Sequence, residues 1–222
     1  MTNASPLNEE EIRDKVRAAM LLGKQRKAEL RNTAPAPVVE STPETVLLPV
    51  LRSTSRHVPL LDMPSFSVIP GALSATLAEV WWTPEKRIRM RHITRAMLGG
   101  RDFDALAGEA VHNLMDAVGV RVSEDPDPDP DKVISLERAG LAASAVAAPS
   151  LRGFLTTTLK SQDVLIALPC PDKFFAARAD SRWAESMREM VVESGYEPDP
   201  LVPSLIRMDG SGMRVIAQRP GG

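Results

Sequence analysis

The sequence contains a single cysteine, Cys170, among 222 residues. One thiol excludes an intramolecular disulfide framework and any metal site that is built from several cysteines. The formal net charge is only -2, which argues against a surface devoted to nucleic acid or to membranes. No segment approaches the roughly 20 apolar residues of a membrane-spanning helix, and the first residues lack the basic and apolar stretches of a secretion signal. We therefore expect a cytoplasmic protein that does not bind membranes.

Several motifs that carry chemistry are also absent. The chain has no His-Glu-x-x-His and no pair of Cys-x-x-Cys motifs, so a zinc site is not expected. The glycine-rich loops that hold nucleotide phosphates and the Gly-x-Ser-x-Gly turn of hydrolases are missing. The acidic, proline-rich stretch 124–131 lacks the central glycine and the distal glutamate of a calcium-binding EF-hand loop. We expect no metal and no cofactor, and a binding protein rather than an enzyme.

The remaining composition is typical of a folded protein with an appendage. Hydrophobic residues make up 43% of the chain and charged residues 25%, as in ordinary globular proteins. Residues 1–31 are expected to form an N-terminal helix, because Asn8 and Glu11 have the spacing of a capping pair before a run of helix formers. Residues 32–64 hold six prolines and are expected to form an extended linker. Residues 65–218 are expected to form an α+β domain.

An apolar island at residues 46–51 interrupts the expected linker. Its central leucines, Leu47 and Leu48, have two interpretations. The favoured one is that the island packs on the domain, because exposed apolar segments are normally covered. The other is a docking motif that inserts into a groove or adds to a sheet edge of a partner. Leu47 and Leu48 are therefore kept as candidates for partner binding.

Within the domain, the pattern predicts a largely antiparallel sheet with packed helices. Alternation or apolar runs indicate strands at 65–69, 76–83, 86–91, 132–136, 163–168, 173–177, 204–208 and 213–218. The run 163–168 is continuously apolar, which is typical of a central strand that is buried on both faces. Helices are expected at 102–118, 140–147 and 149–160, and from Asp180 or Ser181 to 194.

Three stretches of this domain share residues with a bacterial family. They are the helix with Asp102-Phe103-Asp104-Ala105-Leu106 and Ala110-Val111-His112-Asn113-Leu114, the segment Gly140-Leu141-Ala142-Ala143-Ser144, and the strand that ends in Pro169-Cys170-Pro171-Asp172. On these residues, the chain from 65 to 217 resembles an uncharacterised bacterial family of unknown function (YtpQ-like). The resemblance implies an α+β fold and no established activity. Pro171 stands where the family has the arginine of its Pro-x-Arg-Asp motif, so a role that depends on that arginine is not expected here.

The alternation at 86–91 places Arg87, Arg89 and Arg91 on one face of a strand. Three arginines on one side of a sheet can hold phosphates or an acidic segment of a partner. Trp82 lies shortly before them, and an exposed tryptophan would allow a base of single-stranded nucleic acid to stack. We do not favour nucleic acid as the ligand, because the whole chain is not basic. The simplest interpretation is that the arginines face solvent or pair with the acidic stretch 124–131.

Cys170 is the one catalytic candidate. It follows an apolar strand, and a thiolate beside a histidine can attack a carbonyl. However, Cys170 lies between two prolines, and a lone cysteine is commonly a small buried apolar residue. His57 falls in the expected linker, His92 is expected to pack in a strand, and His112 is expected on the exposed face of its helix.

The favoured function is that of a non-enzymatic interaction protein of a bacterial cytoplasm, such as an adaptor, a chaperone-like factor or an inhibitor. Its expected partner is another protein. The candidate contact residues are Arg87, Arg89, Arg91, Trp82, Leu47 and Leu48. The alternatives are a hydrolase that uses Cys170 and weak binding of single-stranded nucleic acid by the arginine face.

Overall fold

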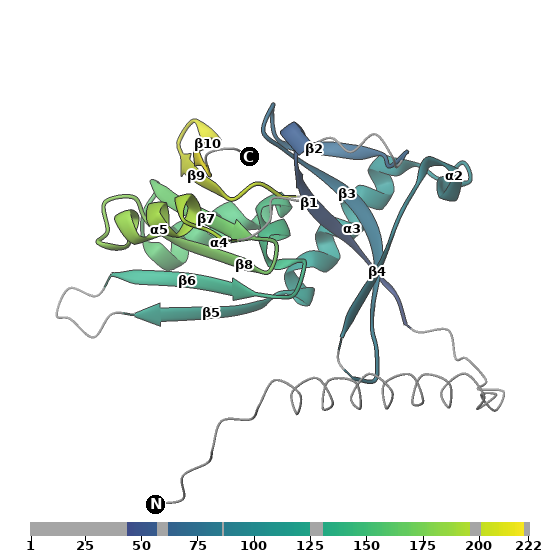
Figure 1. Cartoon of the computed structure of the whole chain (residues 1–222), viewed down its shortest axis with the longest axis horizontal. Helices are drawn as coiled ribbons and strands as arrows, with labels where there is room; N and C mark the ends of the chain where they lie inside the picture. Colours follow the sequence, from purple (N-terminus) through teal and green to yellow (C-terminus); the bar gives the residue numbers. More distant parts are fainter. Residues whose placement is uncertain (1–43, 57–61, 86, 125–130, 196–200, 220–222) are drawn as a thin grey trace, which may run out of the picture. The chain divides into compact units, whose positions relative to one another are not determined.

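Two antiparallel sheets with a few helices make up the part of the chain that the structure, a computed structural model, describes (Figure 1). This part comprises residues 44–56, 62–85, 87–124, 131–195 and 201–219, which all belong to one compact unit, Pro43–Gly222. The expected α+β class is confirmed. The expected N-terminal helix at 1–31, the linker before residue 44, His57 and most of the acidic stretch lie outside the described residues. No helix in these ranges is long and apolar enough to span a membrane.

The first sheet is built around β3 (Leu73–Trp82). β1 (Val46–Ser53) pairs with β3 on one side, from Val46 opposite Val80 to Ser53 opposite Leu73. On the other side, β2 (Ser65–Ile69) pairs with the first half of β3 and β4 (Ile88–His92) with its second half. The strands predicted at 76–83 and 86–91 thus pair as a hairpin around Pro84.

Strand β1 lies inside the segment that was predicted to be an irregular linker, so that prediction is wrong for residues 46–53. Proline removes one backbone N–H, which is tolerated only where that N–H would point away from a neighbouring strand. Pro49 lies opposite Leu77, whose carbonyl accepts a hydrogen bond from Ile93 on the far side of β3. The Pro49–Leu77 pair is thus one that exchanges no hydrogen bonds, and the missing N–H faces the outer edge of β1.

The second sheet has the strand order β10-β9-β7-β8-β6-β5 and consists of three hairpins. They are β5 (Gly119–Glu124) with β6 (Lys132–Glu137), β7 (Val164–Cys170) with β8 (Lys173–Arg178), and β9 (Ser204–Asp209) with β10 (Gly212–Gln218). The prediction that 163–168 forms a central strand is confirmed, because β7 lies between β9 and β8 and six of its seven residues are buried. Strand β5 was not predicted.

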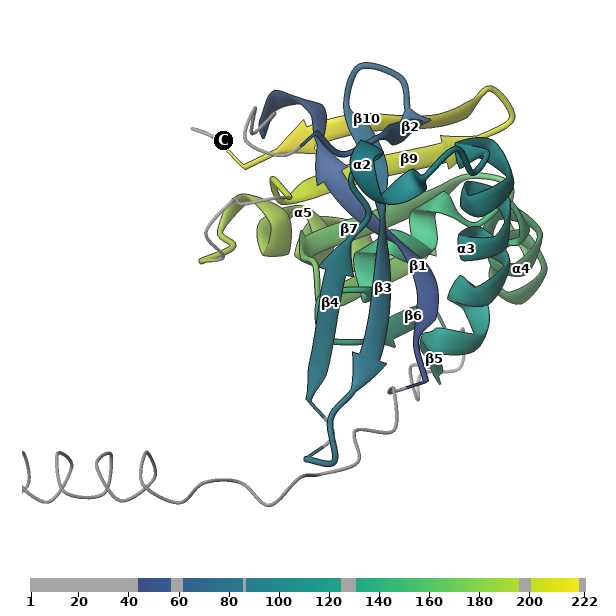
Figure 2. The same cartoon turned by 90° about the vertical axis from the view of Figure 1, so that its right-hand side faces the viewer.

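Helices cover both faces of the second sheet. The helical segments are η1 (Thr54–Arg56), α2 (Arg95–Leu98), α3 (Phe103–Ala117), the 3₁₀ helix η2 (Ala142–Ala147), α4 (Ser150–Leu159) and α5 (Trp183–Val192). Asp102 caps α3 by accepting a hydrogen bond from the backbone of Asp104. The prediction that a helix begins at Asp180 or Ser181 is wrong in its starting point: α5 begins at Trp183, its N-cap Arg182 makes no capping hydrogen bond with its side chain, and Asp180 pairs with Arg178. In Figure 2, α3 and α4 lie on one side of the second sheet and α5 lies on its other side.

A shared core joins the two sheets. One face of the second sheet packs against α4, η2 and the end of α3, and the same cluster includes Leu51 and Leu73 from the first sheet. The opposite face packs against α5 through Met187 and Val191. Burial of a leucine-sized side chain stabilises the folded state by about 1.5–3 kcal/mol. The contact of the first sheet with this cluster therefore holds the two sheets together.

Candidate functional site

An open cleft of about 890 Å³ lies between the two sheets. One wall comes from the end of the β3–β4 hairpin. The other comes from the segment after β6 and from the turn between β7 and β8. The residues that line this inter-sheet cleft are Trp82, Arg87, Ile88, Glu137, Arg138, Ala139, Asp172 and Lys173.

Backbone hydrogen bonds fix the wall that the second sheet provides. The Arg138 N–H donates to the Asp172 carbonyl at 3.1 Å, and the Gly140 N–H donates to Oδ1 of the Asp172 side chain at 2.5 Å. The Ala143 N–H donates to the Pro171 carbonyl at 3.0 Å. The turn Pro171–Asp172 therefore binds residues 138–143 in one position, and Arg138 projects from a rigid support.

Gly140 is required where this wall meets the first sheet. Its φ is +70°, in the left-handed region that side chains with a Cβ rarely adopt. A Cβ on this glycine would also lie 3.1 Å from Cε of Met90 on β4. The close approach allows Leu141 to reach the buried cluster of Leu48 and Val80 on the first sheet.

The guanidinium of Arg138 lies over the ring of Trp82, with 5.0 Å between Cζ and the ring centroid. This distance is that of a cation–π contact, which is worth about 0.5–2 kcal/mol. The Nε atom of Arg138 is buried and has no hydrogen-bond partner within the described residues. A buried donor without an acceptor costs about 1–3 kcal/mol, so Arg138 is held in this position at some cost to the free protein.

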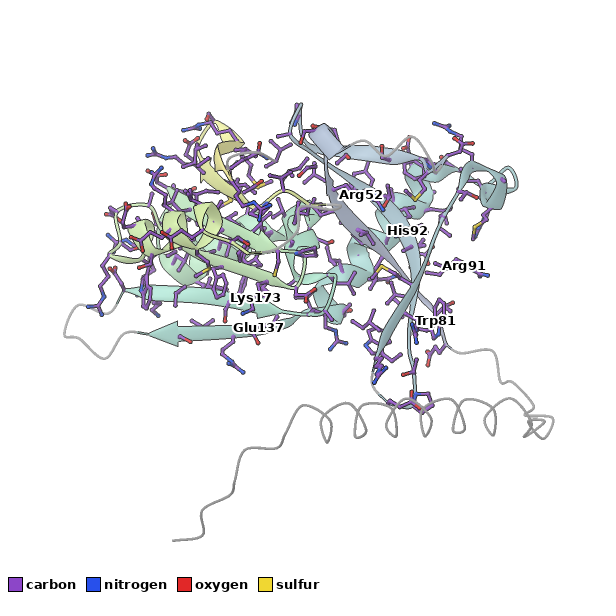
Figure 3. All side chains as sticks on the ribbon, viewed as in Figure 1. Arg52, Trp81, Arg91, His92, Glu137 and Lys173 are labelled. Carbon is purple, nitrogen blue, oxygen red and sulfur yellow. The ribbon has the colours of Figure 1, made fainter. Side chains whose placement is uncertain are left out.

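Charges of both signs surround the Trp82–Arg138 pair. Arg87 and Lys173 add positive charge, and Glu137 and Asp172 add negative charge, so the lining of the cleft has a surplus of one positive charge. Glu137 and Lys173 are directly opposite each other on β6 and β8, and Figure 3 shows them next to each other on the second sheet.

Of the three arginines of the predicted row, Arg89 and Arg91 are two residues apart on β4 and therefore lie on the same face of the strand. Arg87 precedes β4 and lines the cleft with Trp82. Arg91 forms an ion pair with Glu79, directly opposite on β3. Arg89 is exposed and lies opposite Trp81. Because neighbours along a strand point to opposite faces, Trp81 lies on the other face of the sheet from Trp82.

Leu47 and Leu48 belong to the core of the first sheet. The Leu48 side chain is completely buried, and Leu47 packs against the cluster that contains Ile93 and Ala110. The outer edge of β1 is also occupied, because the Leu51 N–H donates to the buried Ser144 hydroxyl at 3.0 Å. The interpretation of this island as a docking motif is therefore wrong, and packing on the domain is correct.

Cys170 ends β7, directly opposite Lys173, and its side chain is half-buried. His92 lies on β4 in the first sheet, and His112 lies on the exposed face of α3, as expected. Within the described residues, no hydrogen bond joins the thiol to either imidazole. This geometry gives no support to a hydrolase that uses Cys170.

A second polar group lies on the same face of the first sheet as Trp82. Arg52 on β1, Thr76 on β3 and His92 on β4 follow a diagonal across the three strands. The hydroxyl of Thr76 and Nδ1 of His92 are buried without a hydrogen-bond partner in the part of the chain described. Burial, together with the positive charge of Arg52, lowers the pKa of His92 (Figure 3).

Sequence reasoning found Trp82 and Arg87 but missed Arg138, Gly140 and Asp172. The signal of the missed residues is weak: a glycine after a strand, and an aspartate in a turn between two strands. Their association depends on a hydrogen bond between residues 32 positions apart, which no local pattern encodes.

The functional interpretation rests on the geometry of the cleft. Its lining combines an aromatic ring, an arginine stacked on that ring, and charged side chains at the rim. In the described ranges, no group of three or more His, Cys, Asp or Glu side chains is placed to hold a metal ion. The chain has no match among protein-family models, curated proteins or solved structures.

Proposed function

We propose that the protein is a non-enzymatic interaction module that binds a short segment of another protein in the inter-sheet cleft. The observation that supports this function is the combination of Trp82 and Ile88 with three cationic side chains, Arg87, Arg138 and Lys173, in one open cleft. Tryptophan and arginine are the side chains most enriched among the residues that dominate binding energy in protein interfaces. The roles of adaptor, chaperone-like factor and inhibitor all use such a surface.

The size of the cleft favours a segment over a large flat surface. A volume of about 890 Å³ falls within the range of about 300–1,000 Å³ that is typical of sites for compact ligands. The surplus of positive charge favours a segment that carries an acidic side chain, because complementary charges raise the rate of encounter and select the partner. We therefore expect a peptide with apolar residues and at least one acidic residue.

The experiment is a selection of 12-residue peptides from a random library displayed on phage, with the full chain as the bait. Selected peptides are then measured by fluorescence anisotropy against two matched pairs of variants. Trp82→Ala should weaken binding by about tenfold or more, whereas Trp81→Ala, on the opposite face, should leave it unchanged. Arg87→Ala should weaken binding several-fold, and Arg89→Ala should not.

The outcomes of this selection are distinct. Peptides whose affinity responds equally to the Trp81→Ala and Trp82→Ala variants would remove the cleft as the binding surface. Failure to enrich any sequence, together with retention of a 12-nucleotide single strand of DNA that weakens steeply with salt, would replace the peptide by nucleic acid. Circular dichroism of each variant confirms that the fold is retained.

A further inference from the structure

We propose that Arg138 binds a carboxylate of the partner segment, with the Trp82 ring as the platform that holds the guanidinium in place. This inference rests on the proposed function and names the chemistry that the cleft selects. An arginine offers a planar fork of donors that matches the two oxygens of a carboxylate. The structure supplies such a fork in a cleft and gives its Nε no acceptor within the described residues.

The position of Arg138 is set before any ligand arrives. Its N–H is bound to the carbonyl of Asp172, and its own carbonyl accepts from the N–H groups of Leu141 and Ala142 at 3.0 and 3.2 Å. The side chain is fixed in turn by the Trp82 ring at 5.0 Å. Because backbone and side chain are both restrained, little conformational entropy is lost when an anion binds, and a preorganised donor binds more tightly than a mobile one.

One donor of the Arg138 guanidinium is left without an acceptor in the described part of the free protein. A surface arginine normally keeps its donors in water, whereas Nε of Arg138 is buried without a partner in the described part of the chain. Local violations of this kind concentrate at sites that bind ligands. An anion at the guanidinium compensates for the lost hydration through charge-assisted hydrogen bonds, which are roughly twice as strong as neutral ones.

The charge of the lining selects a carboxylate over a phosphate. Glu137 and Asp172 lie in the same lining as Arg138. The surplus of one positive charge matches a group of charge -1. A phosphate monoester carries about -1.5 to -2 at neutral pH, and the two acids repel the extra charge. An aspartate, a glutamate or a chain-terminal carboxylate therefore fits this site better.

The test is an NMR titration of the full chain, labelled with ¹⁵N, in which the side-chain Nε–Hε signal of Arg138 is identified by its loss in Arg138→Lys. The probes are three capped peptides: acetyl-Leu-Glu-Leu-amide and its counterparts with glutamine and with phosphoserine in the centre. The glutamate peptide should shift the Arg138 signal in a saturable way. It should also bind about tenfold or more tightly than the glutamine peptide.

Arg138→Lys keeps the charge but removes the planar fork, so it should reduce the preference for glutamate over glutamine to a few-fold. Arg121→Lys, an exposed arginine on β5 outside the cleft lining, should leave that preference unchanged. The titration of the unmodified chain provides the answer even if the lysine variant does not fold.

The results of this titration separate the role of Arg138 from the function of the cleft. Shifts of the Trp82 and Ile88 amides with all three peptides, without a preference for glutamate, would retain the cleft function and overturn the role of Arg138. Tighter binding of the phosphoserine peptide would overturn the choice of a carboxylate. The absence of any shift at the cleft would overturn both proposals.

Discussion

Replacing Gly140 with alanine should destabilise the protein by about 0.5–3 kcal/mol. The left-handed backbone conformation, with φ of +70°, costs a residue with a Cβ about 1–2 kcal/mol. The added Cβ would lie 3.1 Å from Cε of Met90, and the resulting shift of that side chain from its rotamer costs about 0.5–1.5 kcal/mol. Lower flexibility of the unfolded chain offsets about 0.4–1 kcal/mol of this loss.

The assay is urea unfolding of the full chain, monitored by tryptophan fluorescence. An unchanged dependence of the unfolding free energy on urea concentration shows that the folded and unfolded states are the same in each variant. Gly108→Ala is the matched control, because Gly108 lies within α3 and no heavy atom lies within 4 Å of a Cβ added there. Alanine at this helical position should stabilise the protein by about 0.5–1 kcal/mol. The two glycines are therefore expected to respond with opposite signs.

A double variant separates the two causes of the loss at Gly140. In a Met90→Ala background the contact with Cε is absent, so Gly140→Ala should cost less, and only the backbone share should remain. Two results would contradict this explanation. One is a Gly140→Ala variant that is as stable as the unmodified chain. The other is a loss of stability from Gly140→Ala that does not depend on the Met90 side chain and is equalled by the loss from Gly108→Ala.

Two further predictions concern polar groups in the first sheet. Burial and the charge of Arg52 lower the pKa of His92 in the folded protein. As the pH drops below about 6.5, this histidine is protonated in the unfolded chain but stays neutral in the folded protein. The free energy of unfolding should therefore fall below about pH 6.5 and level off below the pKa of His92 in the folded protein. Chemical unfolding across this range should show a shallower fall for His92→Gln, and parallel curves would contradict this cause. Ser144→Ala should cost about 1–3 kcal/mol, because the buried Leu51 N–H loses its acceptor. Thermal unfolding measures this loss, and Ser123→Ala, at an exposed site, should change stability by less than about 0.5 kcal/mol.

Much of the second sheet could be predicted from the sequence because its hairpins are local. The turn Asp209–Gly212 lies between two alternating runs, and the structure pairs Gly212 with Asp209 as such a turn requires. The apolar run in β7 is long enough to indicate a strand that is covered on both faces. In each case the pattern and the partner strand lie within a few residues of each other, so that the sequence alone contains the relevant information.

The first strand and most of the cleft could not be predicted in this way. The prolines before residue 64 indicate an irregular chain, and only the pairing with β3 shows that the N–H missing at Pro49 would point away from β3, where no ladder hydrogen bond is lost. The surroundings of Arg138 depend on Asp172, which follows 34 positions later in the sequence. Such contacts are decided by packing of distant segments, whereas Trp82 and Arg87 could be found because aromatic and basic residues at the end of a hairpin are visible locally.

Strand β1 also determines where the chain can be shortened. A protein that starts at residue 65 would lose the strand that pairs along most of β3 and would leave that central strand with a row of open backbone groups, which is a template for aggregation. It would also lose the Ser53 hydroxyl, which accepts a hydrogen bond from Val202 at 2.9 Å, beside the second sheet. The smallest version of this fold that is stable on its own therefore has to begin before Val46. The prolines of residues 32–64 are nevertheless typical of a linker that could be removed.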